Sequence, residues 1–192
     1  MLCFLAACVS GTSGAAGPAS NLAGSPEEIL NQILEETNKA MPEDKPVPKS
    51  FTSAVTAETS QNQIGLSGND FEKYVTSASV ATAMITTFPH EIGVIETKDA
   101  ASAAEVKKLI ASEGGYDSNK WICVTPEISC VVESGNYLLL AVSRADIVAA
   151  VVAAFTGVAG SVGEPDEFFT SDRASESGGG MGLSVGGGAA PL

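Results

Sequence analysis

The chain has 192 residues, with 10 basic and 23 acidic side chains, so its formal net charge at pH 7 is −13. Nucleic-acid binding depends on clustered lysine and arginine side chains, and the sparse, scattered lysines of this acidic chain exclude a nucleic-acid partner. Anionic lipid headgroups would repel the same charge, so we expect any membrane attachment to be hydrophobic rather than electrostatic.

The charge is unevenly distributed and divides the chain into three parts. Residues 1–24 carry no charged side chain, and we interpret them as a truncated lipoprotein signal followed by a flexible tether. Residues 25–156 have ordinary globular composition and are long enough to form one core without metal or disulfide support. Residues 157–192 are rich in glycine, serine and acidic residues, so we expect a disordered tail.

The N-terminus contains a short motif for lipid attachment. The segment Leu5-Ala6-Ala7-Cys8 resembles the lipobox of bacterial lipoprotein signal peptides. The resemblance implies cleavage before Cys8 and a diacylglycerol on its sulfur, which would anchor the chain outside the cell membrane. A complete signal has a basic region and an apolar stretch of about 7–15 residues, which is longer than the segment here. The alternative is a cytoplasmic protein with an incidental apolar start.

The first half of the globular part begins with helical signals. Ser25 as N-cap, Pro26 at the first helical position and Glu28 three residues after the cap predict a helix that ends near Met41. Residues 42–60 are expected to form an extended connector with one short strand. A second capping pattern at Ser67 predicts a short helix with three apolar residues on one face: Phe71, Tyr74 and Val75.

The second half alternates strands and helices. Residues 80–88 and 91–97 are predicted to form a strand pair, and residues 100–113 a helix that ends at two glycines. Residues 128–133 and 137–143 are joined by a turn typical of hairpins. We expect Ser143 to cap the last helix, whose inward residues would be Ile147, Val148, Val151, Ala154 and Phe155.

This order of elements predicts an α+β fold. We expect a mainly antiparallel sheet of about four to five strands with helices packed on one face. The run Leu138-Leu139-Leu140-Ala141-Val142 is apolar at every position, so this strand should be central and covered on both sides or at least well enclosed.

Four segments of the chain resemble a known family of small lipoproteins from Gram-positive gut anaerobes that carry a domain of unknown function. These segments are Pro26–Leu34, Asp70–Val75, His90–Ile95 and Ser134–Ser143. The resemblance covers most of residues 25–156. It rests on turn and strand residues, so it implies a fold and an extracytoplasmic, lipid-anchored location but no reaction.

The sequence contains no recognisable catalytic or metal motif. His90 is the only histidine and follows a proline, so a role as a turn residue is favoured over metal binding or catalysis. We therefore predict neither a metal nor a cofactor. Four glutamates have the chemistry for a carboxylate pair, although an acidic, solvated face is the default interpretation: Glu91, Glu96, Glu127 and Glu133.

Cysteines and aromatic residues supply the remaining candidates. Cys123 and Cys130 are either buried small hydrophobes or a disulfide of an exported protein. Tyr116, Trp121 and Tyr137 are the best candidates for a recognition surface, with core packing as the alternative for each. In the tail, Phe168 and Phe169 fit an aromatic pair resting on the domain better than a linear binding motif.

These observations favour a non-enzymatic binding or scaffold module at the cell envelope. Its partners would be the membrane, through the N-terminal lipid, and an envelope protein or cell-wall ligand. The alternative is an envelope hydrolase whose carboxylate and serine site has no sequence signature.

Overall fold

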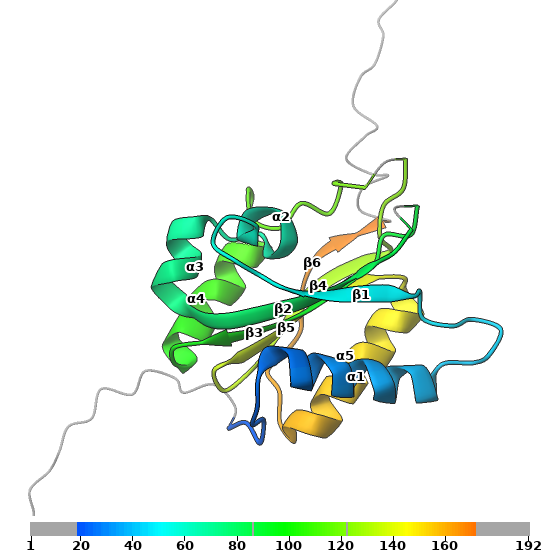
Figure 1. Cartoon of the computed structure of the whole chain (residues 1–192), viewed down its shortest axis with the longest axis horizontal. Coiled ribbons are helices and arrows are strands. Elements are labelled where there is room, and N and C mark those ends of the chain that lie inside the picture. The colour runs from blue at the N-terminus through cyan, green and yellow to red at the C-terminus, as the bar shows by residue number, and fades with distance from the viewer. Residues whose placement is uncertain (1–18, 86, 122, 172–192) are drawn as a thin grey trace, which may run out of the picture.

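The computed structural model of the chain describes residues 19–85, 87–121 and 123–171. The described part folds into five helices and six strands (Figure 1). In chain order these are α1 Pro26–Ala40, β1 Ser50–Ala54, α2 Ser60–Ile64, α3 Gly68–Tyr74, β2 Val75–Ala83, β3 Glu91–Thr97, α4 Ala100–Ala111, β4 Ile128–Ser134, β5 Tyr137–Ser143, α5 Ala145–Ala159 and β6 Asp166–Thr170.

The six strands form one sheet in the order β1-β2-β3-β5-β4-β6, and every neighbouring pair is antiparallel. The predicted α+β class and antiparallel sheet are therefore confirmed, with one more strand than the upper limit we expected. The β4–β5 hairpin turns at Gly135, whose φ of 60° lies in the left-handed region that glycine adopts without strain. The short strand expected between residues 42 and 60 is β1.

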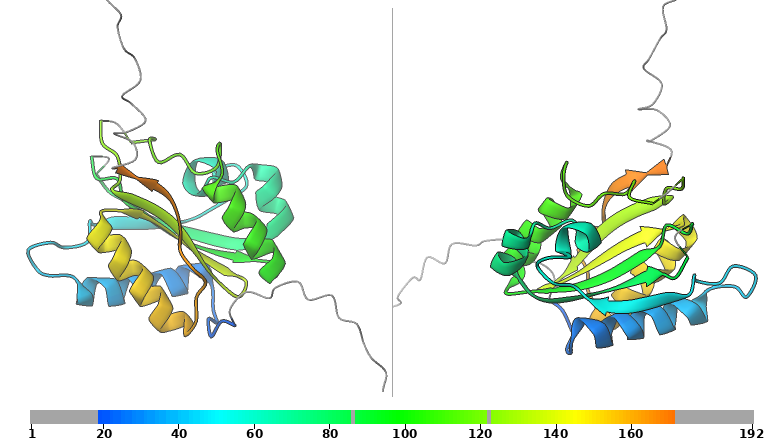
Figure 2. Two further views of the ribbon diagram at one scale, coloured as in Figure 1. Left: turned by 180° about the vertical axis from the view of Figure 1, so that it is seen from behind. Right: turned by 45° about the horizontal axis from the view of Figure 1, so that its top comes forward.

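Helices cover both faces of the sheet, so the prediction that they pack on one face is wrong. Helices α1 and α5 lie together on one face, and α2, α3 and α4 lie on the other (Figures 1 and 2). The cause is β5, in which all seven residues are buried. Because Leu139 packs in the core under α1 and α5, and Leu138 and Leu140 pack in the opposite core, this strand needs a cover on each side.

Helices α1 and α5 run in opposite directions and define the two ends of the molecule. At one end, which we call the entry end, the backbone N–H of Asn21 donates to the carbonyl of Ala159 at the end of α5. At the other, which we call the far end, Arg144 before α5 donates to the carbonyl of Lys45 after α1. The predicted capping box of α1 is confirmed, since the side chain of Ser25 and that of Glu28 each bond to the other's backbone N–H.

The predicted boundaries at both ends of the globular part need correction. Residues 157–170 were expected to be disordered, but α5 continues to Ala159 and β6 pairs with β4. We did not predict strand β6 because its two phenylalanines are flanked by glycine and acidic residues, which favoured a disordered tail. The last residues of the expected tether also belong to the fold, because Leu22 packs against the core under α1 and α5. Residues 1–18 and 172–192 lie outside the described residues.

Two local predictions also fail. Ser143 does not cap α5; it is the last residue of β5, and the carboxylate of Glu127 accepts from the backbone N–H of Ala145 at 2.8 Å instead. Strand β2 begins at Val75 and ends at Ala83, so it is shifted from the expected 80–88. It ends there because its ladder partner β1 begins at Ser50, and Met84 makes the last backbone bond to Lys49.

Candidate functional site

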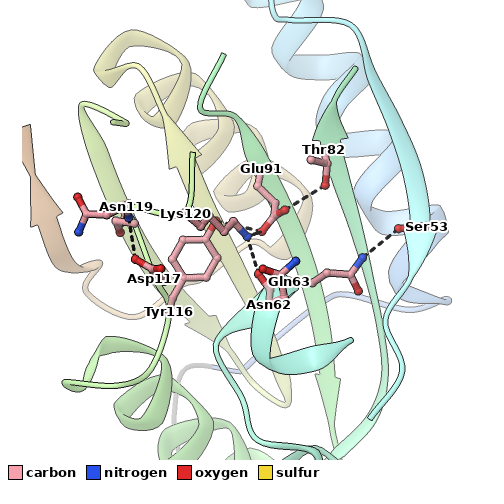
Figure 3. A network of polar contacts seen from close by, with 11 residues as sticks. Ser53, Asn62, Gln63, Thr82, Glu91, Tyr116, Asp117, Asn119 and Lys120 are labelled. Carbon is pink, nitrogen blue, oxygen red and sulfur yellow. Dashed lines mark hydrogen bonds and ion pairs between the residues drawn. The ribbon is translucent and has the colours of Figure 1, made fainter. Parts of the chain in front are cut away.

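A buried polar network lies on the face of the sheet that α2, α3 and α4 cover (Figure 3). Its centre is Glu91 at the start of β3, which is only 2% exposed. One carboxylate oxygen accepts from the Tyr116 hydroxyl at 3.0 Å and from the Lys120 ammonium at 2.7 Å. The other oxygen accepts from the hydroxyl of Thr82 on the neighbouring strand β2 at 3.0 Å. The network thus joins the sheet to the segment that follows α4.

Lys120 and Tyr116 also hold this segment against α2. The Lys120 ammonium donates to the carbonyl of Asn62 at 2.6 Å. At the end of α2 the chain turns at Gly65, with φ of 73°. A Cβ at this position would lie 2.3 Å from the backbone nitrogen of Tyr116, so only glycine allows the two segments to approach this closely.

The arrangement satisfies the Glu91 carboxylate but leaves it little freedom to act on a substrate. Both oxygens have partners within the protein, and a general base must be able to reach a substrate proton. Burial, followed by the Glu91 charge, raises the pKa of Tyr116 well above its ordinary value, so its phenol remains a neutral donor. The network therefore has a structural role: it holds the segment after α4 against the sheet and α2.

Two of the three aromatic residues predicted as a recognition surface meet at this network. The ring centroids of Tyr116 and Trp121 are 6.4 Å apart, and the Lys120 ammonium lies 4.5 Å and 5.1 Å from them. Phe168 of β6 packs edge-on against Tyr116, which confirms that this phenylalanine rests on the domain. Tyr116 is 7% exposed, so it is a core residue and not an open contact.

A groove of about 680 Å³ lies beside this aromatic cluster, between α2, residues 111–119 and β6. We call it the acidic groove because its charged lining residues are Glu58, Glu113 and Asp117. Its polar lining includes backbone and side-chain groups of the loop between α4 and β4. Among the described residues that line it, no polar side chain is both buried and without a hydrogen-bond partner.

The third aromatic candidate lies elsewhere. Tyr137 is at the entry end, where its hydroxyl donates to the carbonyl of Gly24 at 3.1 Å and lies 3.5 Å from Glu96. Burial raises the pKa of its phenol. Tyr137 therefore anchors the start of the described chain and is separate from Tyr116 and Trp121.

The four glutamates considered for a carboxylate pair have separate partners. Glu96 accepts from Ser77, Glu127 caps α5, and the Glu133 carboxylate lies 4.0 Å from Lys107. Together with the Glu91 network, these contacts explain each of the four carboxylates as a structural group.

His90 makes a histidine–serine contact of the kind that a serine hydrolase requires, but this contact lies in the protein interior. Its Nδ1 lies 3.0 Å from the Ser143 hydroxyl on β5, and the two residues are 0% and 1% exposed. Burial and the nearby Arg144 charge lower the pKa of His90 to about 4. A substrate has no access to this pair in the folded protein, so we interpret His90 as a neutral core residue rather than the expected turn residue.

The two cysteines of the globular part are free thiols. Cys130 is buried on β4 in the core under α1 and α5, and burial raises the pKa of its thiol to about 12. Cys123 is exposed in the loop before β4, with φ of 62°. The structure therefore supports the small-hydrophobe alternative for Cys130 and does not contain the disulfide.

Sequence reasoning missed a second groove, at the far end. Its volume is about 690 Å³, and its floor is apolar, formed by residues before β1 and after β2: Pro46, Val47, Pro48, Met84, Ile85 and Phe88. We call it the end groove. Lys45, Lys49 and Arg144 also line it, against one acidic residue, Asp44. The apolar residues that continue past Ala83 were the sequence signal for this groove, but we interpreted them as part of a strand.

Comparison with family models, curated proteins and solved structures finds no match to this chain. Within the described ranges, no helix is both long and apolar enough to cross a bilayer. The same residues contain no group of three histidine, cysteine, aspartate or glutamate side chains placed to hold a metal ion.

Proposed function

We propose that this chain is an exported lipoprotein, anchored by lipid on Cys8, that acts as a non-enzymatic binding module at the cell envelope. The anchoring part rests on the lipobox-like segment Leu5–Cys8 and on the resemblance to lipoproteins of Gram-positive gut anaerobes. Two or more acyl chains hold a protein firmly to a bilayer, since each buried methylene contributes about 0.8 kcal/mol.

The observation that carries the binding role is the gathering of exposed apolar side chains at the far end. In the described residues, four large apolar side chains are exposed, by 47–65%: Phe51, Met84, Ile85 and Phe88. Phe51 lies on β1, and the other three lie between β2 and β3 and line the end groove. A concentrated exposed apolar surface on an otherwise acidic protein is typical of an interaction site.

The position of the end groove fits a tethered molecule. The described chain starts at the entry end, where Asn21 and Leu22 are held against α5 and the core. The 15 residues of α1 separate this point from the end groove, a length of about 22 Å at 1.5 Å per residue. A molecule attached through its N-terminus would therefore present the end groove away from its point of attachment.

Metabolic labelling tests the anchor. The native gene, expressed in its own host in the presence of a radiolabelled fatty acid, should yield a labelled membrane-bound protein. Cys8→Ala should abolish the label, and Cys3→Ala is the matched control that should keep it. Recovery of an unlabelled wild-type protein with residues 1–8 intact would refute the anchor.

Photo-crosslinking in intact cells tests the binding role. A benzophenone side chain at Phe88 should give discrete adducts with an envelope component. The same group at Glu35, an exposed position on α1, should give none. Equal adducts from both positions, or none from either, would refute a binding role for the far end.

A further inference from the structure

The two edges of the sheet differ in how well they are protected from pairing with another strand. Strand β6 forms one edge, and it carries Asp166 and Glu167 and has a register shift against β4. Charged residues and bulges are the devices by which proteins prevent pairing at a sheet edge. Strand β1 forms the other edge and lacks both of them.

Strand β1 has the features of an open edge. Its sequence, Ser50-Phe51-Thr52-Ser53-Ala54, contains no charge and no proline, and its register against β2 is constant over all five residues. Helix α1 packs on the face of the sheet, against β2 and β3, and does not cover this edge (Figure 1).

The register also identifies which backbone groups of β1 face outward. Met84 donates to the carbonyl of Lys49, and Val55 donates to the carbonyl of Ala78, so residues 49 and 55 face β2. In an antiparallel ladder the bonded residues alternate, and residues 51 and 53 therefore also bond to β2. The N–H and C=O groups of Ser50, Thr52 and Ala54 consequently point away from the sheet, and they have no backbone partner among the described residues.

The end groove continues from the start of this open edge. Pro48 and Lys49 line the groove, and β1 begins at the next residue. An extended segment lying along β1 would therefore reach the apolar floor of the groove with side chains beyond Ser50. Arg144 is paired with Asp146, whereas Lys45 and Lys49 have no ion-pair partner among the described residues.

We infer that the partner bound at the far end is an extended segment of another protein that pairs with β1 as a seventh strand. This inference rests on the binding role proposed above and specifies its partner. The segment carries apolar side chains at alternate positions, for the groove, and carboxylates that meet Lys45 and Lys49. Main-chain bonds to Ser50, Thr52 and Ala54 give affinity, and the groove gives specificity.

Charge favours such a segment over a second copy of this chain. Pairing of β1 with β1 of another copy would bring no carboxylate to the lysines, because residues 50–54 are uncharged. It would also join two chains that each have a net charge of −13. The acidic, apolar segment of a different protein meets both the lysines and the groove floor.

A synthetic peptide of five Glu-Val repeats, labelled with fluorescein, provides a direct test by fluorescence anisotropy with the full chain. We expect saturable binding with a Kd below about 1 mM. Thr52→Pro removes one outward N–H and leaves the bonds to β2 in place, so it should raise the Kd at least about tenfold. Thr52→Ala is the matched control and should change the Kd by less than about twofold, because the outward backbone groups are unchanged.

Four further measurements separate the contributions of strand pairing, charge and the groove. A peptide with N-methylated amides should not bind, because it cannot donate to the edge. Lys45→Glu with Lys49→Glu should weaken binding to the acidic peptide, and Phe88→Glu should weaken it through the groove. Amide hydrogen exchange at Thr52 and Ala54 should slow when the unmodified peptide is bound.

Several outcomes would overturn the inference. These are equal affinity of the wild type and Thr52→Pro, no saturable binding to the wild type, and self-association of the chain that Thr52→Pro prevents. Binding to vesicles of phosphatidylcholine and phosphatidylglycerol that depends on Phe88 but not on Thr52 would indicate that the partner is a bilayer instead.

The failure of this inference can be distinguished from the failure of the proposed function. Crosslinking from position 88 together with unchanged peptide binding by Thr52→Pro would refute only the strand pairing. Absence of crosslinked adducts from position 88 would refute the proposed binding role, and absence of fatty-acid labelling would refute the proposed anchor. Both conclusions are independent of the peptide measurements.

Discussion

At the scale of single residues, the most informative side chains are polar groups placed inside the core. His90 lies directly before β3, and Glu91 is the first residue of that strand. His90 is buried beside Ser143, and Glu91 is buried in the network with Tyr116, Lys120 and Thr82. Both side chains are buried with specific partners, so each makes a testable contribution to stability.

His90 should make the folded protein sensitive to mild acid. Its pKa is about 4 in the folded protein and about 6.5 when unfolded, so the unfolded chain binds the proton more readily. Stability from the neutral ring is therefore fully present above pH 6.5 and is lost as the pH falls towards 4. The expected loss is about 2 kcal/mol by pH 5 in urea unfolding.

The control for this pH dependence is His90→Gln, which keeps a polar group near Ser143 but does not titrate. Its free energy of unfolding should be nearly flat between pH 7 and pH 5. A wild-type profile that is equally flat in this window would show that the His90 pKa is not lowered by burial.

The Glu91–Lys120 pair should be costly to break from one side. Lys120→Met leaves the carboxylate without its cation, while the side chain of Glu91 stays 3% exposed, so we expect a loss of about 3 kcal/mol in urea unfolding. Glu91→Gln with Lys120→Met should recover part of that loss, because no unpaired charge remains buried. Losses that simply add would argue against coupling between the two side chains.

At the scale of elements, the faces of strands and helices follow from local patterns, whereas their ends depend on partners. The α1 capping box and the β4–β5 hairpin were predicted from a few adjacent residues each. The last residue of β2 depends on where β1 begins, and the cap of α5 comes from Glu127, 18 positions before Ala145. Such contacts between distant segments have no local signature.

Two proline variants of β1 test which of its backbone N–H groups face β2 and which face outward. Thr52→Pro should lower the free energy of unfolding by less than about 1 kcal/mol, because the lost N–H faces outward. Ser53→Pro removes a bond to β2 and should cost about 3 kcal/mol. Urea unfolding distinguishes the two, and equal costs would show that the register does not place Thr52 outward.

At the scale of the whole molecule, the fold is completed by segments that lie beyond both predicted ends of the globular part. Asn21 and Leu22 are held at the entry end, and β6 completes the sheet beside β4. Phe168 of β6 also packs on Tyr116, so the strand supports the Glu91 network from the side. The folded unit is therefore longer than the predicted 25–156.

Truncation distinguishes the two boundaries. A chain that stops at Thr156 loses the last turn of α5, strand β6 and the contact of Phe168 with Tyr116. It should therefore have an exposed β4 edge and a markedly lower melting temperature. A chain that stops at Ser171 keeps every contact described above and is the matched control. Equal melting temperatures for the two truncated chains would mean that β6 contributes little to stability.

The sequence by itself determined the elements whose signals are local: capped helices, an apolar central strand and a glycine hairpin. Hydrophobic period and capping chemistry act over a few residues, so the pattern is readable without the fold. Only the tertiary structure decided which face each helix covers, that Tyr116 and Trp121 meet while Tyr137 lies apart, and that the cationic and apolar residues of the end groove converge. These arrangements depend on contacts between residues far apart in the chain, and their energies arise only when the sheet has brought them together.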